Sequence, residues 1–306
     1  MKVDFGKFAE NEDVFKDMTF KQVLDSQKFF EKYVSVEFRN TKGQTETYGN
    51  HYYDSNGSLP SAIIDEWMAS LAETGKISWS ERICEIVIDG FKGKRLPFNF
   101  GKVQKFEVVN CKNLENCEGF PEEADYIYVF DCHNITSLKG ITQRPAFKKR
   151  SVYNIGGNIN LKSLEGMPEV VETINGTENA IETLKGCPKI IGHTLNLSNN
   201  KLKTIEDAPF SEVRVLDVSE NSELTISGNE KLLVNEKMYA YKCDKLSIKN
   251  FENEKDFLVR EISTTSFTLH FVNTPKETLR ERKTADAEET KKKCGKIIKK
   301  LFREED

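Results

Sequence analysis

The sequence is poor in the features that mark several large classes of protein. It has no apolar run approaching the roughly 18 residues of a membrane-spanning helix, and its first residues are acidic and lack the apolar stretch of a signal peptide. Lys and Arg number 45 and Asp and Glu number 49, so the net charge of -4 gives no overall nucleic-acid signature. We therefore expect a cytoplasmic protein that does not associate with a membrane.

Residues that carry chemistry are few and scattered. The seven cysteines include no C-x-x-C pair, which in a chain of 306 residues indicates reduced thiols rather than a disulfide framework or a zinc site. The four histidines lie far apart, and no phosphate-binding glycine loop or nucleophile motif occurs. The sequence thus predicts a non-enzymatic protein with no catalytic residue, metal or cofactor. Cys294 among four lysines is the one local candidate nucleophile, although a solvated lysine face explains that segment better.

The middle of the chain is built from a repeat. Four segments have the pattern apolar-x-x-apolar-x-Gly-apolar, and three of them are followed by proline. They begin at Leu114, Ile135, Leu161 and Ile181, and a fifth copy without the glycine begins at Leu202. Before each segment lies a pair of alternating apolar residues, and these pairs begin 21, 26, 21, 21 and 21 residues apart. Alternation predicts a short strand with one inward face, and a unit this small must stack on its neighbours to bury that face.

The apolar pairs and the residues that follow them define the expected register. The pairs are Phe106 and Val108, Ile127 and Val129, Tyr153 and Ile155, Ile174 and Gly176, Leu195 and Leu197, and Leu216 and Val218, with weaker copies at Ile86 and Ile88 and at Tyr239 and Tyr241. A polar residue follows each of the last four strong pairs: Asn158, Asn179, Asn200 and Asn221. Because asparagine carries a donor and an acceptor, we expect these side chains to form a ladder, whereas Cys111 and Cys132 fill the same position only weakly. The glycines of the four segments are expected at positive φ.

The segment LNLSNNKL, from Leu195 to Leu202, matches the L-x-L-x-x-N-x-L core of leucine-rich repeats at every specified position. On these residues, positions 84 to 250 resemble the leucine-rich repeat family. The L-x-x-L-x-G-x-P form, as in LEGMP and LKGCP, is similar to repeats of bacteria and large tailed bacteriophages. The resemblance implies an α/β solenoid with a parallel sheet of about seven to eight short repeats. It also implies protein binding, and for a phage protein the binding and inhibition of a host factor in the host cytoplasm.

Function in such a solenoid normally lies on the concave face of the sheet, where the residues between and beside the buried pairs point outward. The expected outward residues are Lys105, Glu107 and Val109; Tyr126, Tyr128 and Phe130; Val152, Asn154 and Gly156; Thr173, Asn175 and Thr177; Thr194, Asn196 and Ser198; Val215, Asp217 and Ser219; and Met238, Ala240 and Lys242. The second unit offers three aromatic side chains, which are typical anchors of protein interfaces. A register slip of one residue, which would turn them inward, is the alternative.

A surplus of five residues in one repeat, within the segment 142–151, predicts a loop next to these aromatic residues. An insertion in a repeat often lies on the binding face, although a solvated connector remains the alternative. The loop and the outward residues together give the predicted partner-binding set: Tyr126, Tyr128, Phe130, Glu107, Asn154, Arg144, Phe147, Lys148, Lys149 and Arg150. The predicted partner is another protein. Two other hypotheses remain, a nucleic-acid-binding accessory protein that uses the basic loop 144–150 and the lysine-rich tail, and an enzyme whose site is assembled across repeats.

The two ends of the chain are expected to cap the solenoid, which occupies residues 81–250. Residues 1–80 predict an α+β N-terminal cap: a helix in TFKQVLDSQKFFEKY, a hairpin from VSVEFRN and QTETYGN, and a helix in SLPSAIIDEWMASLAETGK. Residues 251–306 predict a strand, FTLHFV, and an amphipathic helix, KKKCGKIIKKLFREED. We expect this helix to dock on the solenoid or to join two chains in a dimer, and an anionic membrane or a nucleic acid is the alternative.

Overall fold

Strands stacked along one axis form the body of the molecule. The computed structural model describes residues 26, 28–30, 32–39, 42–49, 57–74, 76–77, 83–146, 148–225, 232–243, 258–259, 261–264 and 268–270. Within these residues one sheet contains 13 strands, in the order β15-β14-β12-β11-β10-β9-β8-β7-β6-β4-β1-β2, with β13 beside β12. Most of the expected first helix and all of the lysine-rich segment 291–306, with its dimer contact, lie outside the described residues.

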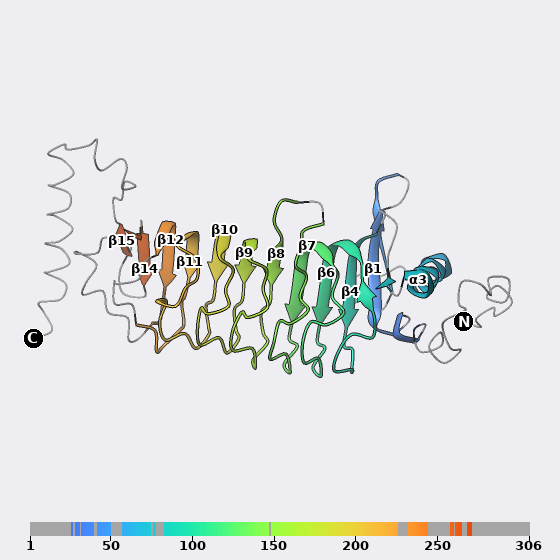
Figure 1. The fold of residues 1–306 in the computed structure, drawn as a ribbon, viewed down its shortest axis with the longest axis horizontal. Coiled ribbons are helices and arrows are strands. Elements are labelled where there is room, and N and C mark those ends of the chain that lie inside the picture. The colour runs from blue at the N-terminus through green and yellow to red at the C-terminus, as the bar shows by residue number, and fades with distance from the viewer. Residues whose placement is uncertain are drawn as a thin grey trace, which may run out of the picture.

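The strands of this sheet are short and follow one another along the chain. They are β1 (Val34–Arg39), β2 (Thr45–Gly49), β4 (Ile83–Asp89), β6 (Lys102–Val109), β7 (Glu123–Phe130), β8 (Val152–Asn154), β9 (Val170–Asn175), β10 (Ile190–Asn196), β11 (Glu212–Asp217), β12 (Leu233–Ala240), β13 (Leu258–Val259), β14 (Glu261–Thr264) and β15 (Thr268–His270). From β4 to β14 every neighbouring pair is parallel, and each strand adds one turn of a solenoid (Figure 1). The chain is thus a mostly parallel β-solenoid, as the repeat predicts.

An antiparallel hairpin and a helix lie at the N-terminal end of the solenoid. The expected hairpin is formed by β1 and β2, and β1 also pairs antiparallel with β4. The expected second helix is α3 (Ser61–Thr74), beside a small sheet of β3 (Lys76–Ile77) and β5 (Asn99–Phe100). Trp67 of α3 is fully buried and packs edge-on against Phe30, with ring centroids 5.2 Å apart. The aromatic residues of this end therefore serve as core, and Figure 1 shows α3 at the N-terminal end of the solenoid.

Asparagine side chains tie each turn of the solenoid to the next. Asn179 accepts a hydrogen bond at Oδ1 from the backbone N–H of Asn158 (2.8 Å) and donates from Nδ2 to the carbonyls of Ile155 (2.8 Å) and Gly176 (2.9 Å). Asn158, Asn200 and Asn221 repeat this pattern, and all four side chains are buried. Because backbone groups buried in a turn need partners, this ladder fixes where each strand ends. The expected asparagine ladder is confirmed.

Cysteines occupy the same ladder position where asparagine is missing. The thiols of Cys111 and Cys132 donate to the carbonyls of Val109 and Phe130 in their own turns, at 3.3 Å each, and to those of Ile88 (3.6 Å) and Val108 (3.7 Å) in the preceding turns. Cys243 donates to the carbonyl of Val218 (3.2 Å) and so belongs to the ladder too. A thiol is only a weak donor, and these turns therefore have weaker ties than the asparagine turns. The expected glycines also have positive φ, at 93° for Gly119, 86° for Gly140, 104° for Gly166 and 87° for Gly186.

The last turn corrects one prediction. Tyr239 and Tyr241 were expected inward and Met238, Ala240 and Lys242 outward, but Met238 and Ala240 are buried whereas Tyr239 is half-buried and Tyr241 is exposed. The cause is one extra residue in β12, because Val213 pairs with Val234 whereas Val215 pairs with Lys237. The extra residue shifts the pairing so that Met238, not Tyr239, follows Leu216 in the sheet. A slip of one residue moves every later side chain to the opposite face.

Removing one rung of the ladder tests its contribution to stability. Asn179→Ala leaves the buried N–H of Asn158 without its partner and removes one of the two amide donors from each of the Ile155 and Gly176 carbonyls, so we expect the free energy of unfolding in urea to fall by about 2 kcal/mol. Asn160→Ala is the matched control, because the Asn160 amide donates to the carbonyl of His133 at the exposed surface (2.7 Å), and its loss should cost less than about 1 kcal/mol. Equal losses in the two variants would contradict a structural role for the ladder.

Candidate functional site

The outward side chains of β6 to β12 form a continuous surface, which we call the outer face. In β7, Ile127 and Val129 are fully buried, whereas Tyr126, Tyr128 and Phe130 lie half-buried on the opposite side of the strand. The alternative register for this strand is therefore wrong, and the three aromatic side chains do belong to the outer face. Strand alternation alone places them there, because side chains on a strand point alternately to its two faces.

The aromatic side chains of β7 are held by each other and by a lysine of the preceding strand. The rings of Tyr128 and Phe130 lie 5.9 Å apart, and Lys105 Nζ lies 4.7 Å from the centre of the Tyr128 ring. Lys105 also forms ion pairs with Glu85 (2.5 Å) and Glu107 (3.1 Å). Burial by itself lowers the pKa of Lys105, but its hydrogen bonds to the two carboxylates and their charges together raise it. Lys105 therefore stays protonated and fixes the Tyr128 ring.

The loop that carries the five extra residues is anchored at both ends and in its middle. Tyr153 donates its hydroxyl to the carbonyl of Thr142 (2.6 Å), and Ser151 donates to the carbonyl of Ala124 (2.7 Å). Between these anchors, the backbone N–H groups of Ala146 and Lys148 both donate to Oδ1 of the buried Asp125, at 3.0 and 2.9 Å. Figure 1 shows the loop rising above the neighbouring turns, just before β8. These hydrogen bonds hold the described residues of the loop, 142–146 and 148–151, against β7 and the start of β8.

The cations of this loop are engaged with neighbouring side chains. Lys148 Nζ lies 4.2 Å from the centre of the Tyr126 ring and donates a hydrogen bond to the Tyr126 hydroxyl, which raises the pKa of Lys148. Arg144 lies 3.7 Å from a carboxylate oxygen of Glu123, and Arg150 lies 3.6 Å from one of Glu172. Lys149 is exposed, and Phe147 lies outside the described residues. Acidic partners therefore offset two of the positive charges.

A second aromatic pair lies on the outer face, in β12 and the turn after it. The rings of Tyr239 and Tyr241 lie 6.0 Å apart, and Lys237 Nζ lies 4.7 Å from the centre of the Tyr239 ring. Sequence reasoning missed this pair because it placed both tyrosines in the core. One signal could have found it. Cys243 follows Ala240 at the distance that separates Cys111 from Val108 and Cys132 from Val129, and this spacing sets the observed register.

Small polar side chains fill the outer face between the two aromatic groups. The central row runs through Asn154, Asn175, Asn196 and Asp217, which pair in register across β8 to β11. Asn196 and Asp217 accept hydrogen bonds at Oδ1 from the backbone N–H groups of Ser198 and Ser219, both at 3.0 Å. Gly156 and Ser219, although they lie in the outward register, are covered by their neighbours. This part of the face offers mainly amides and hydroxyls, with Val152 and Val215 as apolar members.

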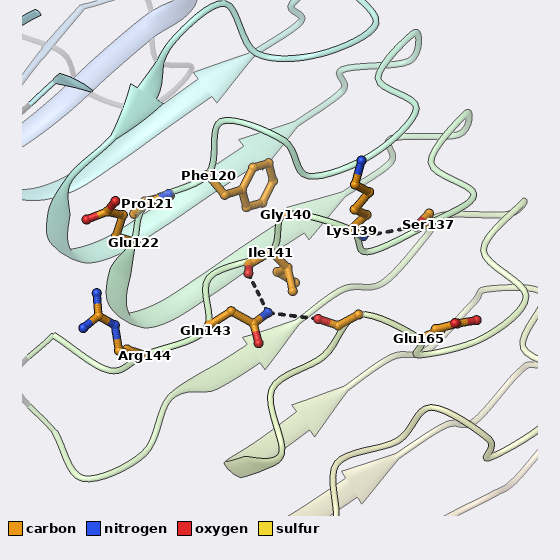
Figure 2. Close-up of a pocket in the computed structure, with 11 residues that line it drawn as sticks. Phe120, Pro121, Glu122, Ser137, Lys139, Gly140, Ile141, Gln143, Arg144 and Glu165 are labelled. Atoms are coloured by element: carbon orange, nitrogen blue, oxygen red, sulfur yellow. Dashed lines mark hydrogen bonds between the residues drawn. The ribbon is translucent and has the colours of Figure 1, made fainter. Parts of the chain in front are cut away.

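A groove of about 790 Å³ lies on another side of the molecule, among the turns that lead into β7, β8 and β9 (Figure 2). Polar residues that line the groove form hydrogen bonds and ion pairs with other residues of the same chain. Gln143 donates from Nε2 to the carbonyls of Ile141 (2.8 Å) and Gly166 (2.9 Å), and Lys139 pairs with Glu118 (2.7 Å). No nucleophile faces a base among its lining residues.

Other chemistry is also unsupported in the part of the chain that the structure describes. Burial raises the pKa of the Cys117 and Cys187 thiols, so these cysteines are poor nucleophiles. No cluster of three or more potential metal ligands occurs among the described residues. None of the helices described is long and apolar enough to cross a membrane. Cys294 lies outside the described residues.

The fold and the outer face together define a parallel β-solenoid that presents aromatic side chains on a rigid sheet. Comparisons with protein-family models, with curated proteins and with solved structures find no match to this chain. The function is therefore inferred from the geometry of the outer face and of the loop 142–151.

The anchoring of the loop by Asp125 can be tested directly. Asp125→Ala removes the acceptor for the N–H groups of Ala146 and Lys148, so we expect these amides to exchange with deuterium about tenfold faster or more. Asp125→Asn keeps an acceptor oxygen and should exchange almost as slowly as the wild-type protein. Hydrogen–deuterium exchange read by mass spectrometry or NMR measures both variants. Unchanged exchange in Asp125→Ala would contradict the anchoring.

Proposed function

We propose that this protein is a non-enzymatic interaction protein that binds another protein through Tyr126, Tyr128, Phe130 and the adjacent loop 142–151. One observation carries the proposal: aromatic side chains lie half-exposed on a strand whose backbone is paired on both sides. Large aromatic side chains that are already held in place lose little conformational entropy when they become buried, and they dominate the binding energy of protein interfaces.

The family part of the proposal is that the solenoid belongs among leucine-rich repeats. Supporting it are the buried asparagine ladder, the 21-residue period and the match of Leu195 to Leu202 to the repeat core. The glycine-proline form of the repeats, similar to that of bacteria and tailed phages, supports a further part, in which the partner is a host factor whose activity is inhibited. Binding by the outer face does not depend on this last step.

A protein partner fits the charges of the site better than a nucleic acid does. Nucleic-acid binding draws most of its affinity from cations that contact phosphates. Here Glu123 and Glu172 lie beside Arg144 and Arg150, and Glu85 and Glu107 flank Lys105. The second candidate function, a nucleic-acid-binding accessory protein, rests on Lys148, Lys149 and the lysine-rich segment 291–306. It predicts an affinity that falls steeply with salt, and a flat response would remove it.

Truncation of the two stacked aromatic side chains tests the proposed function. Tyr128→Ala combined with Phe130→Ala should abolish recovery of the partner in a quantitative affinity purification from the native cell. The melting temperature should fall by only a few degrees, because both rings are half-exposed and lie outside the core. Ile159→Ala, which also truncates an exposed apolar side chain (55% exposed) but in a turn away from the outer face, is the matched control and should leave recovery unchanged. Undiminished recovery with the double variant would contradict the proposed function.

A further inference from the structure

The two aromatic groups of the outer face occupy equivalent positions on β7 and β12. In register, Tyr128 follows Asn154, Asn175, Asn196 and Asp217 across the sheet to Tyr239. The neighbouring row joins Tyr126 to Lys237 in the same way. Each end of the face thus carries two aromatic rings about 6 Å apart, with a lysine over a tyrosine ring. A partner that contacts one row across the sheet meets a tyrosine at both ends.

The surface between the two ends is mainly polar. Five inter-strand steps separate β7 from β12, which at about 4.8 Å each makes a span of about 24 Å. Asn, Thr, Val and Asp217 fill the two rows that join the aromatic groups across β8 to β11, and the same strands carry Glu172, His193 and the exposed Arg214. The outer face therefore joins its two aromatic ends through a largely polar surface.

The composition of this face resembles that of surfaces that bind folded proteins. Tyrosine, serine and asparagine are enriched in antibody paratopes, because rigid aromatic side chains give contact area while small polar ones give adaptable hydrogen bonds. From β7 to the turn after β12, the accessible residues of the outer face include four tyrosines, three asparagines, three threonines and one serine. They are Tyr126, Tyr128, Tyr239, Tyr241, Asn154, Asn175, Asn196, Thr173, Thr177, Thr194 and Ser198.

The area of the face indicates how much of it a partner must cover. The three side chains of one strand present about 10 Å by 20 Å, or about 200 Å², which is far below the roughly 800 Å² per partner of a standard interface. The face from β6 to β12 spans six steps and about 29 Å by 20 Å, or about 600 Å², and the loop 142–151 adds to this. Only the whole face approaches the area of a stable complex.

We infer that a single folded partner protein spans the outer face from β7 to β12, and that Tyr239 and Tyr241 form its second anchor. The inference rests on the proposed function and adds the extent of the site. The partner presents hydrogen-bonding groups to the amides and hydroxyls of β8 to β11 and packs against the tyrosines at both ends. A nucleic acid is disfavoured by the carboxylates of Glu172 on β9 and Asp217 on β11.

The test uses the full chain with a photoreactive benzoylphenylalanine in place of Tyr128 in one variant and of Tyr241 in another. After illumination in the native cell, mass spectrometry identifies the cross-linked product of each variant. We expect the same protein from both positions. That protein is then purified and titrated by calorimetry against wild type, Tyr128→Ala with Phe130→Ala, and Tyr239→Ala with Tyr241→Ala. Each double variant should weaken its affinity about tenfold or more, while Ile159→Ala leaves it unchanged.

The outcomes separate this inference from the proposed function. If only the Tyr128 and Phe130 variant loses affinity, the proposed function stands and a partner that spans the face is wrong. If neither double variant changes the affinity, both are wrong. Cross-linking to a second copy of the chain, or recovery of a nucleic acid in place of a protein, overturns the inference by naming a different occupant.

Discussion

The structure depends on how each turn of the solenoid closes after its strand. At that point the chain reverses inside the core, and its backbone N–H and carbonyl groups need partners that water cannot supply. The side chains of Asn158, Asn179, Asn200 and Asn221 provide both kinds of partner and join each turn to the previous one. Since this ladder sets the point at which each strand ends, it also sets which side chains of the strand face outward. The outward position of the residues on β8 to β11 follows from it.

The ladder is weaker where cysteine replaces asparagine, and the aromatic side chains of the outer face lie at those places. Cys111 follows β6, which carries Lys105, and Cys132 follows β7, which carries the three aromatic side chains. Cys243 follows the pair Tyr239 and Tyr241. At the first of these sites, other contacts supplement the thiol. Lys105 pairs with Glu85 and Glu107 across neighbouring strands, and Asp125 accepts hydrogen bonds from the loop. The regular middle of the sheet is a scaffold, and the two ends hold the side chains that can anchor a partner.

Periodicity was sufficient to predict the solenoid, the ladder, the hairpin β1–β2 and the outward position of Tyr126, Tyr128 and Phe130. It failed at β12, where one extra residue between Val234 and Lys237 reversed the two faces of the strand, because a tyrosine in an alternating pattern suits either face. The anchoring of the loop by Asp125 could not be predicted either. It requires a buried carboxylate to meet two backbone N–H groups that lie 21 and 23 residues later in the chain, and no local pattern encodes such a contact. Long-range polar contacts and single-residue insertions are therefore what the sequence left undetermined.

The central claim is that the register of the sheet presents aromatic side chains at both ends of one face. Chemical labelling of the folded protein with tetranitromethane, followed by peptide mass spectrometry, tests it most directly, because nitration requires an accessible tyrosine ring. The account predicts that Tyr128, Tyr239 and Tyr241 are nitrated, whereas Tyr153, which is fully buried and in which burial raises the pKa of the hydroxyl, is protected until the protein is unfolded. Protection of Tyr239 and Tyr241, or nitration of Tyr153 in the folded protein, would contradict it.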